Sequence, residues 1–222
     1  MVPPPGPSPA AAGGYIDGAP RRGLTRPLVE FLDPEEAWAP LRRQGVVKVV
    51  DTPKELRLEL ADSDAVVVMD IAADDHPDAK ALPAAIKRVP RGALANFVEA
   101  IVHKMRLQRT FAIPVGRWRE IFDAVSEGMK GNAAWREVDT SASIELNRRD
   151  PLEFGPANAH TLRDLVRTLL DAARDSEHGL TLCSDGAPLV MEIMPRGEMI
   201  LFAGHASLAK QCEELLAHAK VD

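Results

Sequence analysis

The chain has 222 residues and a formal net charge of −6, and hydrophobic residues make up 45% of it. These values are typical of a globular protein that has one large domain or two small ones. The negative charge argues against a surface that binds polyanions over its whole extent, but it does not exclude a local basic stripe. No apolar run reaches the roughly 18 residues of a membrane span. We therefore expect an intracellular protein, either cytoplasmic or nuclear.

The chain contains two cysteines, Cys183 and Cys212, and neither stands in a Cys-x-x-Cys or Cys/His ligand pattern. Cys183 lies in a predicted strand, and Cys212 lies on the apolar face of a predicted helix. A free thiol in such a place packs as a small hydrophobic side chain. We expect two buried, reduced thiols, which fits a reducing compartment, and we expect no cofactor.

Residues 1–23 are rich in proline, glycine and alanine and show no period, which predicts a disordered tail. A first α+β unit is expected over residues 24–108. It begins with a helix over 33–45, where Asp33 is placed to cap, Pro34 suits the first position and Gly45 suits the end. Three strands should follow. Their residues are 46–50, 55–60 and 65–71.

A loop with a short helix is expected over residues 72–91, and an amphipathic helix over 92–108. A second α+β unit should then occupy residues 109–222. Its predicted elements, in chain order, are a strand (110–115), a helix (116–131), two candidate strands (133–138 and 141–147), a helix (158–179), a three-strand meander (179–204) and a last helix (205–219).

The predicted fold class is α+β, with antiparallel three-strand meanders packed against helices. The short turns between the strand runs leave no room for parallel crossovers. Both units show a helix, three strands and a helix in that order, which suggests two similar halves. The match is one of pattern, with little identity between the two segments. Reuse of a common α+β unit would explain it equally well.

Residues 110–204 resemble the last subdomain of the sliding-clamp family, which includes proliferating cell nuclear antigen and the checkpoint clamp subunits. The stretch "HTLRDLVRTLLDAA" (160–173) is similar to the clamp helix, and "DGAPLVMEI" (185–193) followed by "MILFA" (199–203) is similar to the closing strands. The resemblance implies a ring-forming oligomer that acts through protein partners and lies around DNA.

Three arginines of the predicted 158–179 helix are the candidate nucleic-acid-binding residues. Arg163, Arg167 and Arg174 recur at helical spacing opposite the apolar leucines. On a clamp-like helix they would contact phosphates without reading sequence. Asp164 and Asp171 lie beside them, however, and a solvent face with alternating charges is typical of ordinary exposed helices.

The segment "MDIAADDHPD" (69–78) is the candidate metal site. Asp70, Asp74, Asp75 and His76 follow a valine-rich strand, and hard cations prefer several oxygen ligands of this kind. The spacing matches no EF-hand loop and no pair of histidines one helical turn apart. A solvated acidic loop is the alternative interpretation.

No catalytic residues are predicted. Cys183 and Ser184 stand near histidines in the sequence, but the surrounding "CSDG" is explained by a hairpin turn. The sequence favours a non-enzymatic binding or scaffold protein, clamp-like in the C-terminal half, that acts through a protein partner, a homo-oligomer or DNA. The alternative is a metal-dependent enzyme that uses the acidic loop at 70–78. An exposed strand edge that pairs with another chain is a third way of binding.

Overall fold

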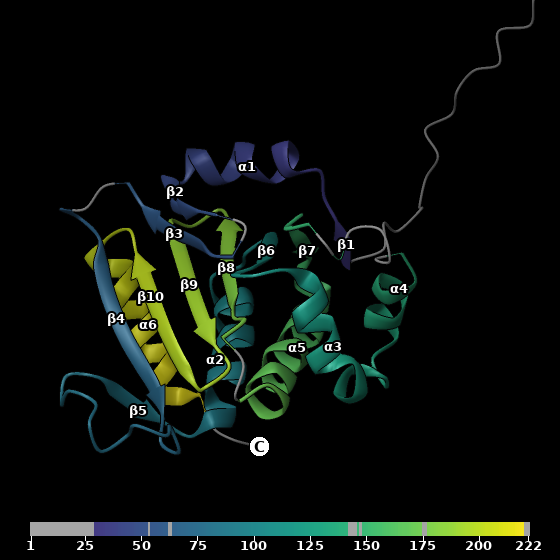
Figure 1. Ribbon diagram of the computed structural model, residues 1–222. Helices are drawn as coiled ribbons and strands as arrows, with labels where there is room; N and C mark the ends of the chain where they lie inside the picture. Colours follow the sequence, from purple (N-terminus) through teal and green to yellow (C-terminus); the bar gives the residue numbers. More distant parts are fainter. Residues whose placement is uncertain are drawn as a thin grey trace, which may run out of the picture.

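The computed structural model describes residues 29–52, 54–61, 64–141, 146, 148–174 and 177–219. These residues form an eight-stranded mixed sheet, a separate two-stranded sheet and helices on both sides of the large sheet (Figure 1). The predicted α+β class, with mostly antiparallel strands, is confirmed. The predicted tail at 1–23 lies outside the described residues, as do most residues of the predicted strand at 141–147.

The first described elements are β1 (Val29–Phe31), α1 (Pro34–Arg43), β2 (Val46–Asp51) and β3 (Leu56–Leu60). The helix begins where the sequence predicts, because the Asp33 carboxylate accepts a hydrogen bond of 2.9 Å from the backbone N–H of Glu35. Strands β2 and β3 pair as an antiparallel hairpin. This hairpin forms the two-stranded sheet.

The third predicted strand, β4 (Val67–Ala73), does not continue this hairpin. Its residues 67–72 pair with β10 (Glu198–Ala203) in the large sheet. Residues 74–86 form turns without the predicted short helix, and β5 (Lys87–Val89) follows as a parallel neighbour of β4. The predicted N-terminal meander is therefore divided between two sheets. Helix α2 (Arg91–Lys104) comes next, as expected.

The middle of the chain contains β6 (Arg109–Pro114), α3 (Trp118–Met129), α4 (Ala133–Ser141) and β7 (Leu152–Phe154). The prediction of a strand at 133–138 is wrong, because these residues begin α4. Trp135 and Val138 are both buried, and their spacing of three places them on one helical face. The Asn132 side chain accepts a hydrogen bond of 3.1 Å from the Trp135 N–H and so caps the helix.

The last part contains a 3₁₀ turn (Pro156–Asn158), α5 (Ala159–Ala172), β8 (Leu180–Asp185), β9 (Leu189–Met194), β10 and α6 (Ala206–His218). Strands β8, β9 and β10 form the predicted antiparallel meander. Helix α6 is capped by its preceding residue, because His205 Nδ1 accepts a hydrogen bond of 3.1 Å from the Leu208 N–H.

The strand order of the large sheet is β1-β7-β6-β8-β9-β10-β4-β5. Strands from both predicted units are thus neighbours in one sheet, and the predicted unit boundaries themselves stay a prediction. Helices α2, α5 and α6 cover one face, which we call the helix face, and the main hydrophobic core lies between them and the sheet (Figure 1). No helix among the described residues is long and apolar enough to cross a membrane.

A second, smaller core lies on the opposite face, which we call the hairpin face. Helix α1 and the β2–β3 hairpin supply one side of it, through residues such as Trp38, Leu41 and Leu58. The sheet supplies the other side. Its contribution comes from Phe111, Ile113, Cys183, Val190 and Phe202. The alternating burial of β3 follows from this packing, because its three leucines face the sheet.

Candidate functional site

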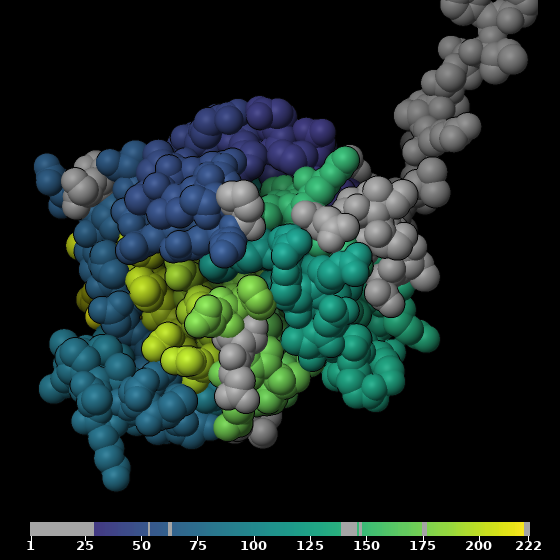
Figure 2. Space-filling view, in the orientation of Figure 1, coloured from purple at the N-terminus to yellow at the C-terminus, as the bar shows by residue number. Residues whose placement is uncertain are grey.

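The hairpin face of the large sheet is covered over one part only. Along β9, Val190 is buried in the second core, whereas Glu192 and Met194, which point the same way, are only partly buried. Ile200 on β10 is partly buried and Asp70 on β4 is exposed. Figure 2 shows this part of the meander as green and yellow atoms between the hairpin above and residues 74–86 below.

Two adjoining cavities of about 420 Å³ and 550 Å³ occupy this uncovered part. Both are lined by Glu192 and Met194, and we call the two cavities together the sheet groove. Its first half is lined by residues of β4, β10 and the turns at 74–86, among them Asp70, Leu82, Ile86, Glu198 and Ile200. Its second half runs past the end of β6 to α3. The residues that line it include Lys54, Glu55, Arg117, Glu120, Glu177 and His178.

Arg91, at the start of α2, holds the turns that form one wall of the groove. Its guanidinium donates to both carboxylate oxygens of Asp75, at 2.9 and 3.1 Å. It also donates to the backbone oxygens of Leu170, Pro195 and Arg196 at 2.9–3.1 Å. The Arg91 side chain is 8% exposed. One arginine therefore ties residues 74–86 to the end of α5 and to the β9–β10 turn.

His76 is a second fixed point in the same wall. It is buried, and its Nδ1 accepts a hydrogen bond of 3.1 Å from the Asp78 N–H. Its Nε2 lies 2.9 Å from Glu198 Oε1, but the N–H is not aligned for a hydrogen bond, so we treat this as a close polar contact. Leu82 and Ile86 thus stand on a segment that is anchored at its start.

Carboxylates predominate along the groove. Burial raises the pKa of Glu192, and the neighbouring Glu55 and Glu59 raise it further, whereas Arg57 opposes them. Glu120 Oε1 lies 3.1 Å from Arg117 Nε. Glu120 Oε2 is buried without a hydrogen-bond donor in the described part of the chain. The groove therefore combines an apolar floor with an acidic rim.

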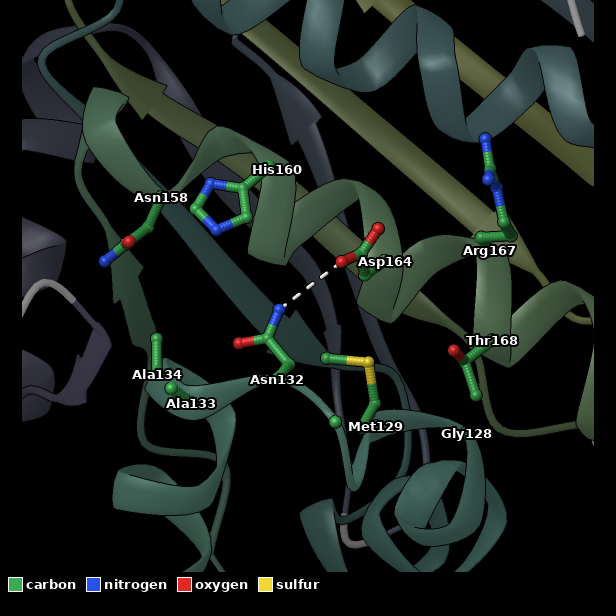
Figure 3. Close-up of a pocket in the computed structure, with 11 residues that line it drawn as sticks. Gly128, Met129, Asn132, Ala133, Ala134, Asn158, His160, Asp164, Arg167 and Thr168 are labelled. Carbon is green, nitrogen blue, oxygen red and sulfur yellow. Dashed lines mark hydrogen bonds between the residues drawn. The ribbon is translucent and has the colours of Figure 1, made fainter. Parts of the chain in front are cut away.

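A larger cavity of about 690 Å³ lies on the other side of the molecule, between α5 and the α3–α4 connection. Figure 3 shows Asn132 reaching toward Asp164, and this hydrogen bond is 3.3 Å long. Arg167 points away from both toward the helix above, where it donates to Asn96 Oδ1 at 2.7 Å. Asn158 also points away from Asp164 (Figure 3). Because these polar groups do not converge on one point, we do not place the function in this cavity.

The three candidate nucleic-acid-binding arginines do not form one exposed face. Arg163 contacts Glu99 of α2 at 3.0 Å and Asp164 at 2.9 Å, and its side chain is 26% exposed. Arg167 lies beside it, also between α5 and α2. Arg174 stands apart beyond the end of α5, where it contacts Asp75 at 3.2 Å. Their role in binding DNA stays a prediction.

The candidate metal ligands Asp70, Asp74, Asp75 and His76 do not face one common point. Asp75 contacts Arg91 and Arg174, whereas His76 faces Glu198. Asp70 lies on the hairpin face of β4 and lines the sheet groove. Asp74 is exposed. Over the described ranges, no group of three or more His, Cys, Asp or Glu side chains is placed to hold a metal ion. The metal-dependent enzyme stays a prediction, and the described residues supply no set of ligands for it.

Both cysteines are free and buried, as the sequence predicts. Burial raises the pKa of each thiol, and that of Cys212 reaches about 11. A thiolate is the reactive form of cysteine, so neither group is activated as a nucleophile.

Sequence reasoning missed the residues that carry the groove, namely Glu192, Met194 and Ile200. One local signal was present, because Glu192 interrupts the otherwise apolar run "LVMEIM" of β9. An acidic residue within an apolar strand indicates that one face of that strand is not fully covered.

Comparisons with known proteins give no assignment for this site. No family model, curated protein or solved structure matches the chain. The resemblance to sliding clamps is therefore neither supported nor contradicted, and it stays a prediction. The function has to be argued from the groove itself.

Proposed function

We propose that this chain is a non-enzymatic binding protein that holds a polypeptide segment of a partner protein in the sheet groove. The observation that carries the proposal is the incomplete cover of the hairpin face. Helix α1 and the β2–β3 hairpin bury one part of this face. In the neighbouring part, Met194 and Ile200 are only partly buried and line the groove, and Ile200 marks the edge of the second core.

The length of the groove suits a polypeptide better than a compact metabolite. It extends from Asp70 on β4 to Arg117 beside β6, which are four strand positions apart in the sheet order. Neighbouring strands lie about 4.8 Å apart, so this span is about 19 Å, or about six residues of extended chain. Such a segment would cross the strands rather than extend the sheet at an edge.

The edges of the sheets offer less favourable sites for a partner. The outer strands β1 and β5 have three residues each. In β2 the pairing register shifts between Lys48 and Val50, and Lys48 lies over the Trp38 ring at 4.5 Å. Short edge strands, bulges and lysines on an edge strand all discourage pairing with another strand. The face of the large sheet therefore remains the better candidate.

The composition of the groove floor supports binding of side chains. Met194 is only partly buried at the junction of the two halves, and methionine adapts its shape to different apolar partners. Leu82 and Ile86 add apolar surface from the wall. A bound apolar side chain would remove both its own surface and this floor from water, which is the main favourable term in association.

The proposal can be tested with peptides displayed on phage. A library of random peptides about 12 residues long would be selected on the full-length protein, and the selected peptides would be synthesised. Their affinity for wild type and for Met194→Gln would then be compared by fluorescence anisotropy. Glutamine keeps the size of methionine but removes apolar surface, so we expect affinity to fall by about tenfold.

Val49→Thr is the matched control, because Val49 is an exposed valine on β2 (52% exposed) that does not line the groove. This variant should bind the peptides as wild type does. Peptides that bind Met194→Gln as tightly as wild type would contradict the proposal, as would a selection that enriches no peptide at all.

A further inference from the structure

We infer that the partner segment is cationic, with lysine or arginine side chains that alternate with apolar ones and pair with the carboxylates of the sheet groove. This inference rests on the proposed function and specifies the class of partner. Six carboxylates line the two halves of the groove: Asp70, Glu198, Glu192, Glu55, Glu120 and Glu177. The cationic side chains that line it are Lys54 and Arg117.

The protein's own cations neutralise only part of this charge. Arg117 contacts Glu120 at 3.1 Å, and Arg149 lies near the same carboxylate. The neighbour of Glu198, at 2.9 Å, is the imidazole of His76. Glu192 has no ion pair of this kind within the described residues, and Arg57, which lies near it, contacts Glu59 at 3.2 Å. The carboxylate of Glu192, in the middle of the groove, is therefore available to an incoming cation.

Glu192 also stands where an ion pair is strengthened by its surroundings. It lies between the two halves of the groove, beside the apolar Met194, and is itself partly buried. Charges attract each other more strongly where less water surrounds them. A bound lysine or arginine would also offset the repulsion that Glu192 experiences from Glu55 and Glu59.

Glu120 lies at the other end of the groove, where Arg117 contacts its Oε1 atom and Arg149 lies near its carboxylate. Its Oε2 atom is buried and accepts no hydrogen bond from the described residues. Glu120 itself lines the groove. A buried acceptor without a donor is unfavourable. A donor from the partner at this end of the groove would satisfy it, and lysine and arginine supply donors without acceptors.

Charge also excludes two other occupants. A polyanion such as nucleic acid would meet carboxylates along the whole groove and would be repelled. A second copy of this chain that docked through the same groove would place like charges against each other. The cationic, amphipathic segment of a different protein is the occupant that fits both the floor and the rim.

The test uses the selected 12-residue peptides whose binding depends on Met194. We expect an excess of lysine and arginine over the starting library and a depletion of aspartate and glutamate. Glu192→Gln should weaken binding of these peptides by about three- to tenfold. Raised salt should weaken it as well. Glu214→Gln, an exposed glutamate of α6 outside the groove, removes the same charge elsewhere and should leave affinity unchanged.

The outcomes separate this inference from the proposed function. Peptides that depend on Met194 but carry no excess of cations would overturn the inference and leave the proposed function standing. An unchanged affinity of cationic peptides for Glu192→Gln would do the same. If no selected peptide depends on Met194, the proposed function fails and the inference falls with it.

Discussion

At the scale of single residues, the contacts of Arg91 predict a large loss of stability on conservative substitution. Lysine carries one ammonium group in place of the planar fork that reaches Asp75 and three backbone oxygens. The hydrogen bonds to Leu170 and Pro195 are partly buried, and an acceptor that loses its donor in such a place costs about 1–2 kcal/mol. We expect Arg91→Lys to lower the free energy of unfolding by about 2–4 kcal/mol, measured by urea denaturation.

Arg174→Lys is the matched control, because Arg174 contacts the same carboxylate, Asp75, at 3.2 Å. Its side chain is 53% exposed, and an exposed ion pair contributes at most about 1 kcal/mol. The control should therefore change stability by less than this amount. Equal losses in the two variants would show that Asp75, rather than the backbone oxygens, accounts for the effect of Arg91.

In contrast to Arg91→Lys, the substitution Glu192→Gln is expected to raise the stability of the fold. Its pKa is raised by burial and by the nearby Glu55 and Glu59, against the attraction of Arg57. The folded state thus keeps a proton on Glu192 at pH values where the unfolded state has lost it, so wild type loses stability as pH rises through this range. Glutamine does not titrate. Glu192→Gln should therefore melt higher than wild type at neutral pH.

The advantage of Glu192→Gln should shrink as the pH is lowered toward and below the ordinary glutamate pKa of about 4.3. Thermal melts of both proteins across this range would measure it, with the exposed Glu214→Gln of α6 as the control. A variant that melts lower than wild type at neutral pH would contradict the prediction. Together with weaker peptide binding, a gain in stability would indicate that Glu192 serves binding rather than folding.

At the scale of elements, the approach of α3 to α5 depends on a glycine. A Cβ atom on Gly128 of α3 would lie 2.5 Å from Cγ2 of Thr168 on α5. Threonine is stiff about its first side-chain torsion, so the helices would have to move apart. Alanine is about 1 kcal/mol better than glycine in a helix interior, and Gly128, in the last turn of α3, would gain at most this amount. We expect Gly128→Ala instead to destabilise by about 1–3 kcal/mol in urea unfolding.

Gly131→Ala tests the same substitution three residues later, where an added Cβ meets nothing within 4 Å. This variant should unfold within about 1 kcal/mol of wild type, or slightly above it. If both variants gain stability, α3 and α5 are not in the close contact that Gly128 and Thr168 indicate.

At the scale of the whole molecule, the charge distribution predicts weak interaction with DNA. The net charge is −6. Arg163 and Arg174 already contact carboxylates, and Arg167 donates to Asn96. Binding to DNA depends on cations that are free to replace counterions at phosphates. We therefore expect no binding of duplex DNA at physiological salt in a fluorescence anisotropy titration.

Measurable binding of duplex DNA at physiological salt would contradict this prediction. Binding that is lost when Arg163, Arg167 and Arg174 are all replaced by glutamate would support the DNA interface predicted from the sequence. The exposed Arg42, Arg43 and Arg119, replaced in the same way, control for the change in net charge. Equal losses in both triple variants would indicate a nonspecific charge effect.

The sequence by itself determined the elements whose signals are local. The cap at Asp33 and the two tight turns of the β8–β10 meander depend on residues close together in the chain, and so the sequence predicts them correctly. The spacing of Trp135 and Val138 was a helical signal too, but a segment of six residues also allowed a strand. The turns and the three-residue β5 carried too few residues for a period to appear.

Only the tertiary structure decided which strand lies beside which and what remains uncovered. A period of two shows that Glu192 and Met194 share a face with Val190, but it does not show where the covering hairpin ends. That limit depends on the pairing of β4 with β10 instead of β3, a contact between residues more than 120 positions apart in the chain. In that pairing Met69, Ile71 and Ala73 of β4 are buried in the main core, while Asp70 on its other face lines the groove, so the groove exists only once the whole sheet has formed.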